Sequence, residues 1–210
     1  MARLPRHAAP PVKFLALGDS YTIGEGVEIA ERWPLQLAER LRARGITMAE
    51  PQIIARSGWS TDELVAAIDA DVEAGKLYPP YDLVSLQIGV NNQYRGREAA
   101  DYAIEFGYLL GRAISFAGGE SLQMFVLSIP DWGGTPFARA GGRDREHVAR
   151  EIDKYNAQAA AVCRARGVSF VDITDLSRDP SLAEALVADG LHPSGEMYRR
   201  WVERVELSIA

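Results

Sequence analysis

The stretch VKFLALGDSYT, residues 12–22, decides the fold that we expect for the whole chain. Its first part, Val12 to Leu17, is an apolar run that ends at Gly18, which is typical of a strand buried on both faces. Such strands occur in parallel sheets that are covered by helices, so we expect this strand to be central. The polar residues that follow it, among them Ser20, then stand at the carboxyl end of a central strand.

The rest of the chain alternates between strand and helix patterns. Further strands are expected over residues 52–55, 81–88, 124–129 and 168–173, and helices over residues 31–44, 97–116, 145–166 and 181–187. Another helix should begin at Ser60, which lies three residues before Glu63 as in a capping box, and a last one at Ser194. Strands that alternate with helices form a parallel sheet covered on both faces. The expected fold class is therefore α/β.

Composition and charge narrow the possible functions. The chain has 210 residues, of which 47% are hydrophobic and 25% charged, as in ordinary globular proteins. We expect a flexible, proline-rich leader over residues 1–11 and a single domain over residues 12–210. The formal net charge of -6 argues against binding to nucleic acid or to an anionic membrane, because such binding begins with the neutralisation of phosphates. A small neutral or cationic substrate fits better, and the oligomeric state stays open.

The N-terminal region and the single cysteine bear on location and cofactors. The apolar run after Pro11 is too short for a signal-peptide core or a membrane span, so we expect a cytoplasmic protein without stable membrane association. Cys163 is the only cysteine, so no internal disulfide can form, and its helical pattern predicts a small buried side chain. The chain has too few histidines and cysteines for a zinc cluster and no nucleotide-binding glycine pattern. Neither a metal nor a cofactor is expected.

Four polar motifs follow the expected strands or come shortly after them. They are GDSYT at residues 18–22, RSGWS at 56–60, GVNN at 89–92, expected as a turn, and DGLHP at 189–193. In open parallel sheets, ligands bind in the crevice beyond the carboxyl ends of the strands. We therefore expect all four motifs to lie at one edge of the sheet.

Three of these residues have the chemistry of nucleophilic catalysis. A serine hydroxyl needs a base to take its proton, and His192 is the only histidine in a loop at a strand end, so it is the natural base for Ser20. Asp189 lies three residues earlier and can accept the Nδ1 proton of that ring. Each motif also has a plainer interpretation: a serine after a strand is usually a turn or cap residue, and DGLHP alone could equally be a turn.

Acyl transfer also requires donors for the oxyanion of the tetrahedral intermediate. The candidates are the amide N–H groups of Ser20 and Gly58 and the side-chain NH₂ of Asn91, although Gly58 and Asn91 could equally be ordinary turn residues. Asp19 is adjacent to Ser20 and is interpreted as an acceptor that organises the loop.

The glycine-rich segment over residues 131–144 is too long for a simple connection and could act as a lid. Its Trp132 and Phe137, together with Tyr94, are candidates for an apolar wall that contacts the substrate. The alternative is that these aromatic residues only anchor a long loop to the body of the protein.

Taken together, the four motifs resemble those of the SGNH (GDSL-type) hydrolase family, and the resemblance covers nearly the whole chain. It implies a three-layer α/β/α sandwich with a five-stranded parallel sheet, of the flavodoxin-like type, and hydrolysis of esters or thioesters without a cofactor. Ser20, Gly58, Asn91 and His192 match the family's four eponymous residues. One departure is Asn92, which stands where the family usually has an aspartate. Another is Tyr21, in place of the usual leucine.

The function expected from these residues is hydrolysis of a small carboxylic ester through a Ser20–His192–Asp189 triad and an acyl-enzyme. Acyl transfer to another alcohol and thioester hydrolysis would use the same site, and the sequence does not separate them from ester hydrolysis. A non-catalytic module that binds a small ligand in the same crevice is the alternative from another class.

Overall fold

In the computed structural model, which describes residues 10–182 and 185–209, five parallel strands form one sheet. They are β1 (Phe14–Gly18), β2 (Gln52–Ala55), β3 (Leu83–Gln87), β4 (Met124–Leu127) and β5 (Ser169–Val171), in the spatial order β2-β1-β3-β4-β5. Every residue of β1 is buried, and Gly18 at its end pairs with Ala55 on one side and Gln87 on the other. The prediction of a central strand buried on both faces is confirmed.

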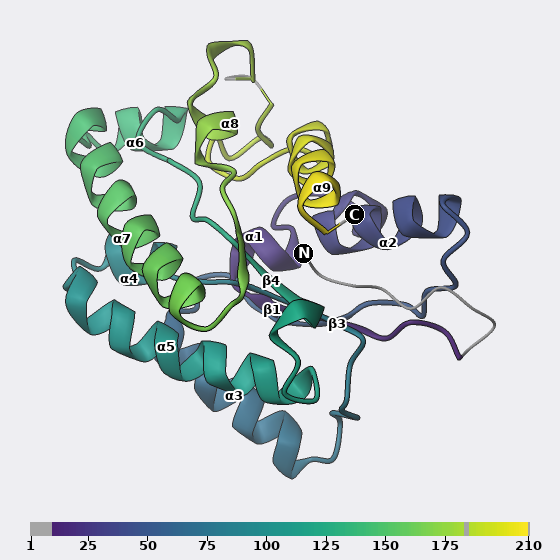
Figure 1. Cartoon of the computed structure of the whole chain (residues 1–210). Helices are drawn as coiled ribbons and strands as arrows, with labels where there is room; N and C mark the ends of the chain where they lie inside the picture. The colour runs from purple at the N-terminus through teal and green to yellow at the C-terminus, as the bar shows by residue number, and fades with distance from the viewer. Residues whose placement is uncertain (1–9, 183–184, 210) are drawn as a thin grey trace.

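Long helices cover both faces of the sheet (Figure 1). The helices α3 (Thr61–Glu73), α5 (Ala99–Phe116) and α7 (Arg145–Ala165) lie side by side on one face. The other face carries α2 (Trp33–Ala43) and α9 (Gly195–Ile209), which pack against each other. The expected three-layer α/β/α sandwich is confirmed. The expected leader falls mostly on residues 1–9, which lie outside the described residues.

Short helices follow several of the strands along the chain. They are α1 (Ser20–Ile23), α4 (Val90–Tyr94), α6 (Pro136–Ala140) and α8 (Thr174–Arg178), with single 3-10 turns at η1 (Ile29–Glu31), η2 (Ser121–Gln123) and η3 (Pro180–Leu182). The interpretation of GVNN as a turn is wrong, because Val90 begins α4. Gly89 makes the change of direction possible: its φ is +128°, and a Cβ there would lie 2.6 Å from the ring of Tyr102.

The prediction of a helix over residues 181–187 is also wrong for the residues that the structure describes. Only the 3-10 turn η3 forms at its start, and residues 183–184 lie outside the described residues. Leu186 instead forms an antiparallel bridge with Pro193, and the Val187 N–H donates to the carbonyl of His192 (2.9 Å). These backbone bonds close the turn that contains Asp189, so the segment supports the site instead of continuing as a helix.

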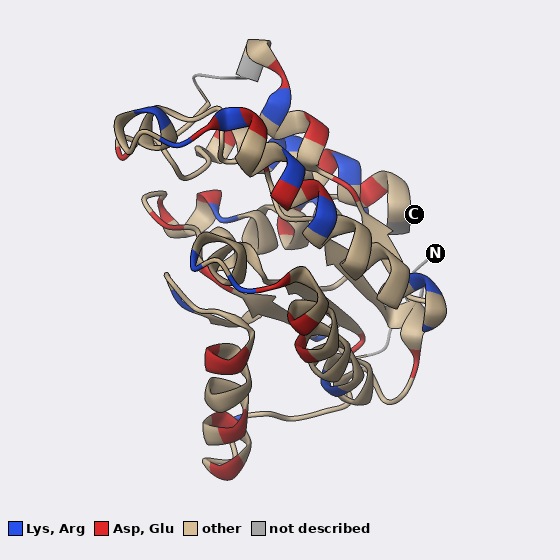
Figure 2. Cartoon of the chain, turned by 90° about the vertical axis from the view of Figure 1, so that its left-hand side faces the viewer, with Lys and Arg blue, Asp and Glu red and all other residues tan. Residues whose placement is uncertain are grey.

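The core and the surface fit the composition. Buried aliphatic and aromatic side chains fill the space between the layers, and Cys163 is buried among them as expected. Figure 2 shows acidic and basic residues interspersed along α7, whereas the charged residues of α3 are all acidic. None of the described helices has the length and apolar character needed to cross a membrane.

Candidate active site

Ser20 lies directly after the central strand, as the first residue of α1. The chain turns at Asp19, whose side chain accepts the backbone N–H of Tyr21 (3.0 Å) and so caps the helix. Asp19 therefore has the loop-organising contact expected for it. Ser20 is only 6% exposed, but it lines a cavity of about 220 Å³ that is open to solvent. The fold thus presents a serine hydroxyl in a confined space.

His192 lines the same cavity and is oriented by Asp189. The Nδ1 atom of the imidazole lies 2.6 Å from Asp189 Oδ2, while Oδ1 accepts the backbone N–H groups of Leu191 (2.8 Å) and His192 (3.0 Å). Burial acts to raise the pKa of Asp189, but its hydrogen bonds with the His192 side chain and with these two N–H groups outweigh burial and lower the pKa. The carboxylate is therefore held in its charged form beside the imidazole.

Gly58 and Asn91 border the same cavity from neighbouring loops. Gly58 has a φ of +85°, which favours glycine, and the space where a Cβ would stand is open, so a substrate can approach its backbone. The Asn91 side chain donates one N–H of its amide to the carbonyl of Trp59 (2.9 Å). An amide NH₂ has two hydrogens, so Asn91 keeps a second donor for a ligand. The predicted nucleophile, base and oxyanion donors thus come together.

Arg95 is a residue of this site that sequence reasoning missed. Its guanidinium donates to the carbonyl of Gly58 (2.7 Å), to Ser60 Oγ (3.0 Å) and to the carboxylate of Glu63 (2.9 Å). It thereby fixes the loop on which Gly58 lies. The signal was its spacing: Arg95 follows Asn91 by four residues, which places both on one face of a helix, but only once the stretch is recognised as helical.

Asn92 has a clear structural role despite departing from the usual aspartate. It is fully buried, its Oδ1 accepts the backbone N–H of Thr61 (3.1 Å), and its Nδ2 donates to Thr61 Oγ1 (2.6 Å) and Glu105 Oε2 (3.1 Å). Thr61 also donates its hydroxyl to Glu105. The amide of Asn92 thus links the carboxylate of Glu105 to Thr61 at the start of α3.

The segment over residues 131–144 is folded onto the cavity. Trp132 is buried and donates its indole N–H to Gln93 (2.9 Å), so it anchors the segment, whereas Phe137 on α6 and Tyr94 on α4 are partly exposed at the rim. All three candidate substrate-contacting side chains line the cavity. The guanidinium of Arg143 lies 5.0 Å from the centre of the Tyr94 ring, which adds a cation–π contact between the segment and α4.

The buried carboxyl of Asp19 gives a prediction about pH and stability. Burial raises its pKa from 3.8 to about 7, and the backbone N–H donors only partly offset this. Between these values the folded chain binds a proton that the unfolded chain releases, so the free energy of unfolding should fall as the pH rises through this window. Asp19→Asn keeps an acceptor for the Tyr21 N–H but does not titrate. The free energy of unfolding of Asp19→Asn minus that of wild type should therefore increase by about 2 kcal/mol from pH 5 to pH 8.

Urea denaturation of both proteins at several pH values measures this difference. Asp175→Asn is the control: the hydrogen bond and ion pair with Arg204 lower the pKa of the Asp175 carboxyl, so the difference of this variant from wild type should stay constant between pH 5 and pH 8. A difference between Asp19→Asn and wild type that stays constant with pH would contradict the prediction.

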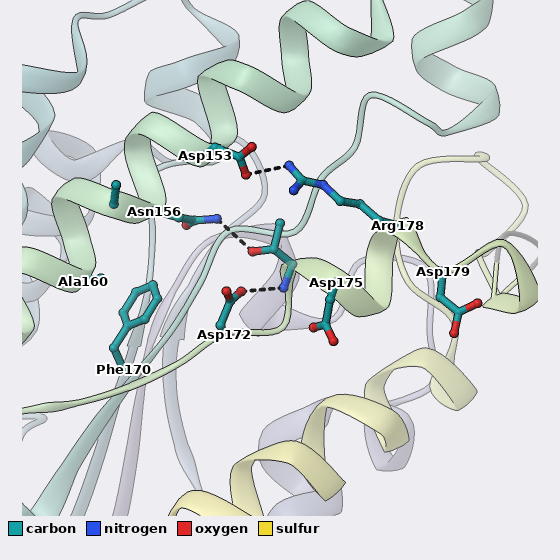
Figure 3. Close-up of a pocket in the computed structure, with 10 residues that line it drawn as sticks. Asp153, Asn156, Ala160, Phe170, Asp172, Asp175, Arg178 and Asp179 are labelled. Atoms are coloured by element: carbon teal, nitrogen blue, oxygen red, sulfur yellow. Dashed lines mark hydrogen bonds and ion pairs between the residues drawn. The ribbon is translucent and has the colours of Figure 1, made fainter.

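A larger hollow lies elsewhere on the molecule, between α7 and α8 (Figure 3). Its volume is about 600 Å³ and four aspartates line it, but Asp153 is paired with Arg178 (2.7 Å) and Asp172 accepts the backbone N–H of Thr174 (2.9 Å). None of the candidate catalytic residues lies there. Across residues 10–182 and 185–209, no cluster of three or more His, Cys, Asp or Glu side chains is arranged to hold a metal ion.

A parallel sheet with a serine, and a histidine paired to an aspartate, around one cavity at its carboxyl edge is the arrangement of the α/β class of serine hydrolases. The model of the GDSL-like lipase/acylhydrolase family matches residues 16–200. The chain therefore belongs to the GDSL-like lipase/acylhydrolase family.

Solved structures with the same fold have little sequence identity to this chain. TesA superposes with a TM-score of 0.72 at 20% identity, covering 94% of this chain and 97% of TesA. A mutant of Axe2, an acetyl-xylooligosaccharide esterase from Geobacillus Stearmophilus, gives 0.70 at 18% identity over 95% and 94% of the two chains. The esterase EstA from Pseudoalteromonas sp., in a structure inhibited by monoethylphosphonate, gives 0.67 at 15% identity over 94% and 96%. No protein with a curated function matches this chain in sequence.

Proposed function

We propose that this hydrolase is a serine esterase that cleaves small carboxylic esters with Ser20 as nucleophile, His192 as base and Asp189 as the acid that orients the base. The observation that carries the proposal is the cavity that Ser20 and His192 both line, with Asp189 Oδ2 2.6 Å from Nδ1 of the imidazole. Membership of an acylhydrolase family and fold similarity to esterases support the reaction class.

The proposed reaction starts when His192 Nε2 takes the proton of the Ser20 hydroxyl, and Ser20 Oγ attacks the acyl carbon. The N–H groups of Ser20 and Gly58 and the free N–H of Asn91 stabilise the oxyanion. His192 then returns the proton to the leaving alcohol. Water, deprotonated by the same imidazole, attacks the acyl-enzyme, and His192 returns this proton to Ser20 Oγ as the carboxylic acid leaves. Among the described residues no hydrogen bond joins Ser20 to His192, and such bonds often tighten only when substrate binds.

The size of the cavity favours a small substrate. About 220 Å³ is below the usual range of pockets for drug-sized ligands. Acyl transfer to an acceptor alcohol and thioester hydrolysis remain variants of the same chemistry. Adding an acceptor alcohol and measuring the new ester distinguishes acyl transfer from hydrolysis. A parallel assay with acyl thioesters tests for thioester hydrolysis.

The test of the proposed function combines turnover with covalent labelling. We expect the protein to hydrolyse p-nitrophenyl acetate or butyrate and to lose this activity after treatment with a fluorophosphonate, with the label found on Ser20 by mass spectrometry. A label on another residue would contradict the assignment of the nucleophile. If the protein showed no turnover and Ser20 were not labelled, the result would favour the non-catalytic binding module.

A further inference from the structure

A second cavity lies next to the catalytic one. It has a volume of about 180 Å³ and is enclosed by the segment after β4, the end of α8, the turn before His192 and one side of α9. Met197 and Trp201 of α9 form an apolar side, and Leu186 adds a further aliphatic side chain. The opposite side of this cavity carries charged side chains, among them the ion pair of Asp131 and Arg178 (2.8 Å). An aliphatic chain would therefore lie along the α9 side, where burial of methylene groups stabilises a complex by the hydrophobic effect.

Three side chains line both cavities and so form the partition between them: Tyr21, Trp132 and Leu191. Tyr21 and Trp132 are each 3% exposed. The ring of Tyr21 lies 5.7 Å from that of His192 and 6.0 Å from that of Trp201, measured between centroids. Trp132 is held by its hydrogen bond to Gln93. Both aromatic parts of the partition are therefore fixed.

Leu191 is the part of the partition that can change at least cost. Its side chain is half-buried and aliphatic, and only its backbone N–H is engaged, by Asp189. The hydrogen bond to Asp189 does not depend on the nature of the side chain. Substituting Leu191 can therefore change the partition while leaving the contacts of the Asp189–His192 pair in place.

We propose that Leu191 determines substrate length: it confines the aliphatic part of the ester to the catalytic cavity, and its removal admits longer chains to the second cavity. This inference rests on the proposed esterase function. Each methylene buried in the second cavity should raise kcat/KM about fourfold, which corresponds to about 0.8 kcal/mol. The aliphatic chain can belong to the acyl or to the alcohol side of the ester.

The experiment compares wild type with Leu191→Ala on two substrate series. In the first, p-nitrophenyl esters vary from acetyl to octanoyl, and in the second, alkyl acetates vary from ethyl to octyl. We expect Leu191→Ala to raise kcat/KM for the longest members of one series by at least about tenfold relative to the shortest. The series that responds identifies the side of the ester. No gain in either series would overturn the proposal.

Three further variants show whether the second cavity is the space that is used. Met197 lines only the second cavity, so Met197→Phe alone should keep the wild-type length profile, and in combination with Leu191→Ala it should remove most of the gain. Leu191→Phe should shift the preference to shorter chains. A shift of this kind requires a folded, active variant, so it cannot be mistaken for a loss of activity through misfolding. A gain that persists in the double variant would overturn the role of the second cavity.

Binding of fatty acids separates failure of this inference from failure of the proposed function. Octanoate binding can be followed by calorimetry and by the fluorescence of Trp132 and Trp201, whether or not any ester is turned over. We expect octanoate to bind at least about tenfold more tightly to Leu191→Ala than to wild type, and acetate to show no such difference. If wild type hydrolyses esters but neither turnover nor octanoate binding responds to Leu191→Ala, the proposed function stands and the role of Leu191 is refuted.

Discussion

Ser20→Ala is expected to lower kcat/KM for p-nitrophenyl acetate by about 10⁴-fold or more. Alanine removes the only atom of this side chain that can attack the acyl carbon, while the backbone N–H at position 20 and the rest of the cavity remain. Residual activity should then come only from binding and from the oxyanion donors. Steady-state kinetics with active-site titration of the wild type measures the loss.

Ser57 provides the matched control, because it is a second serine that lines the same cavity and its hydroxyl donates to Glu25. Ser57→Ala should retain activity within about tenfold of wild type, since no base comparable to His192 lies against it among the described residues. If Ser57→Ala lost activity and Ser20→Ala kept it, the nucleophile would be Ser57 and the proposed mechanism would be wrong.

Asp189→Asn should have the second largest effect, a decrease in kcat of up to about 10⁴-fold. The asparagine can still accept the N–H groups of Leu191 and His192 through Oδ1, so the turn is preserved. Its NH₂ group, however, would face Nδ1 of the imidazole and favour the tautomer that cannot accept the proton of Ser20. Because the pKa of Asp189 is lowered, its carboxylate stays charged at pH values at which a free aspartate already takes up a proton. The contact of the charged carboxylate with His192 is lost only as the pH falls through this lowered pKa.

The control for Asp189 is Asp175→Asn, which removes a carboxylate that is paired with Arg204 (2.9 Å) and does not line the catalytic cavity. That variant should change kcat by less than about threefold, in line with the small contribution of exposed ion pairs. A thermal unfolding curve for each variant checks folding. A kcat for Asp189→Asn within about tenfold of wild type would reduce Asp189 to a structural acceptor of the turn.

The layers of the fold could be predicted because periodicity is a strong signal over long elements. The apolar run before Gly18 identified the central strand, and the alternation of strands and helices led to the parallel sheet. Parallel topology then placed the ends of distant strands at one edge, which is why Ser20, Gly58, Asn91 and His192 could be expected to meet.

The short elements could not be predicted, because too few residues carry their pattern. The helix α4 has five residues, and its start depends on the left-handed backbone of Gly89 beneath the ring of Tyr102. The segment over 185–187 has helix-forming residues, yet its backbone groups pair with residues 192–194. In both cases, tertiary contacts decide the conformation over local propensity.

The contacts of the site were less predictable than its members. Arg95 acts through a carbonyl oxygen, and no sequence pattern indicates which carbonyl a guanidinium will reach. The sequence pattern marks Tyr21 only as a departure from the usual leucine, whereas in the structure its side chain lines two cavities and lies between them. A role that depends on which side chains line the same cavity can be inferred only from how the side chains pack.

The contact between Asn92 and Glu105 limits the side chains that position 92 can accept. Replacing Asn92 by aspartate alone would bury a second negative charge against Glu105, and like charges at such a distance are strongly disfavoured. The two positions are therefore energetically coupled: Asn92→Asp should destabilise the fold less when Glu105 is replaced by glutamine than when Glu105 is retained.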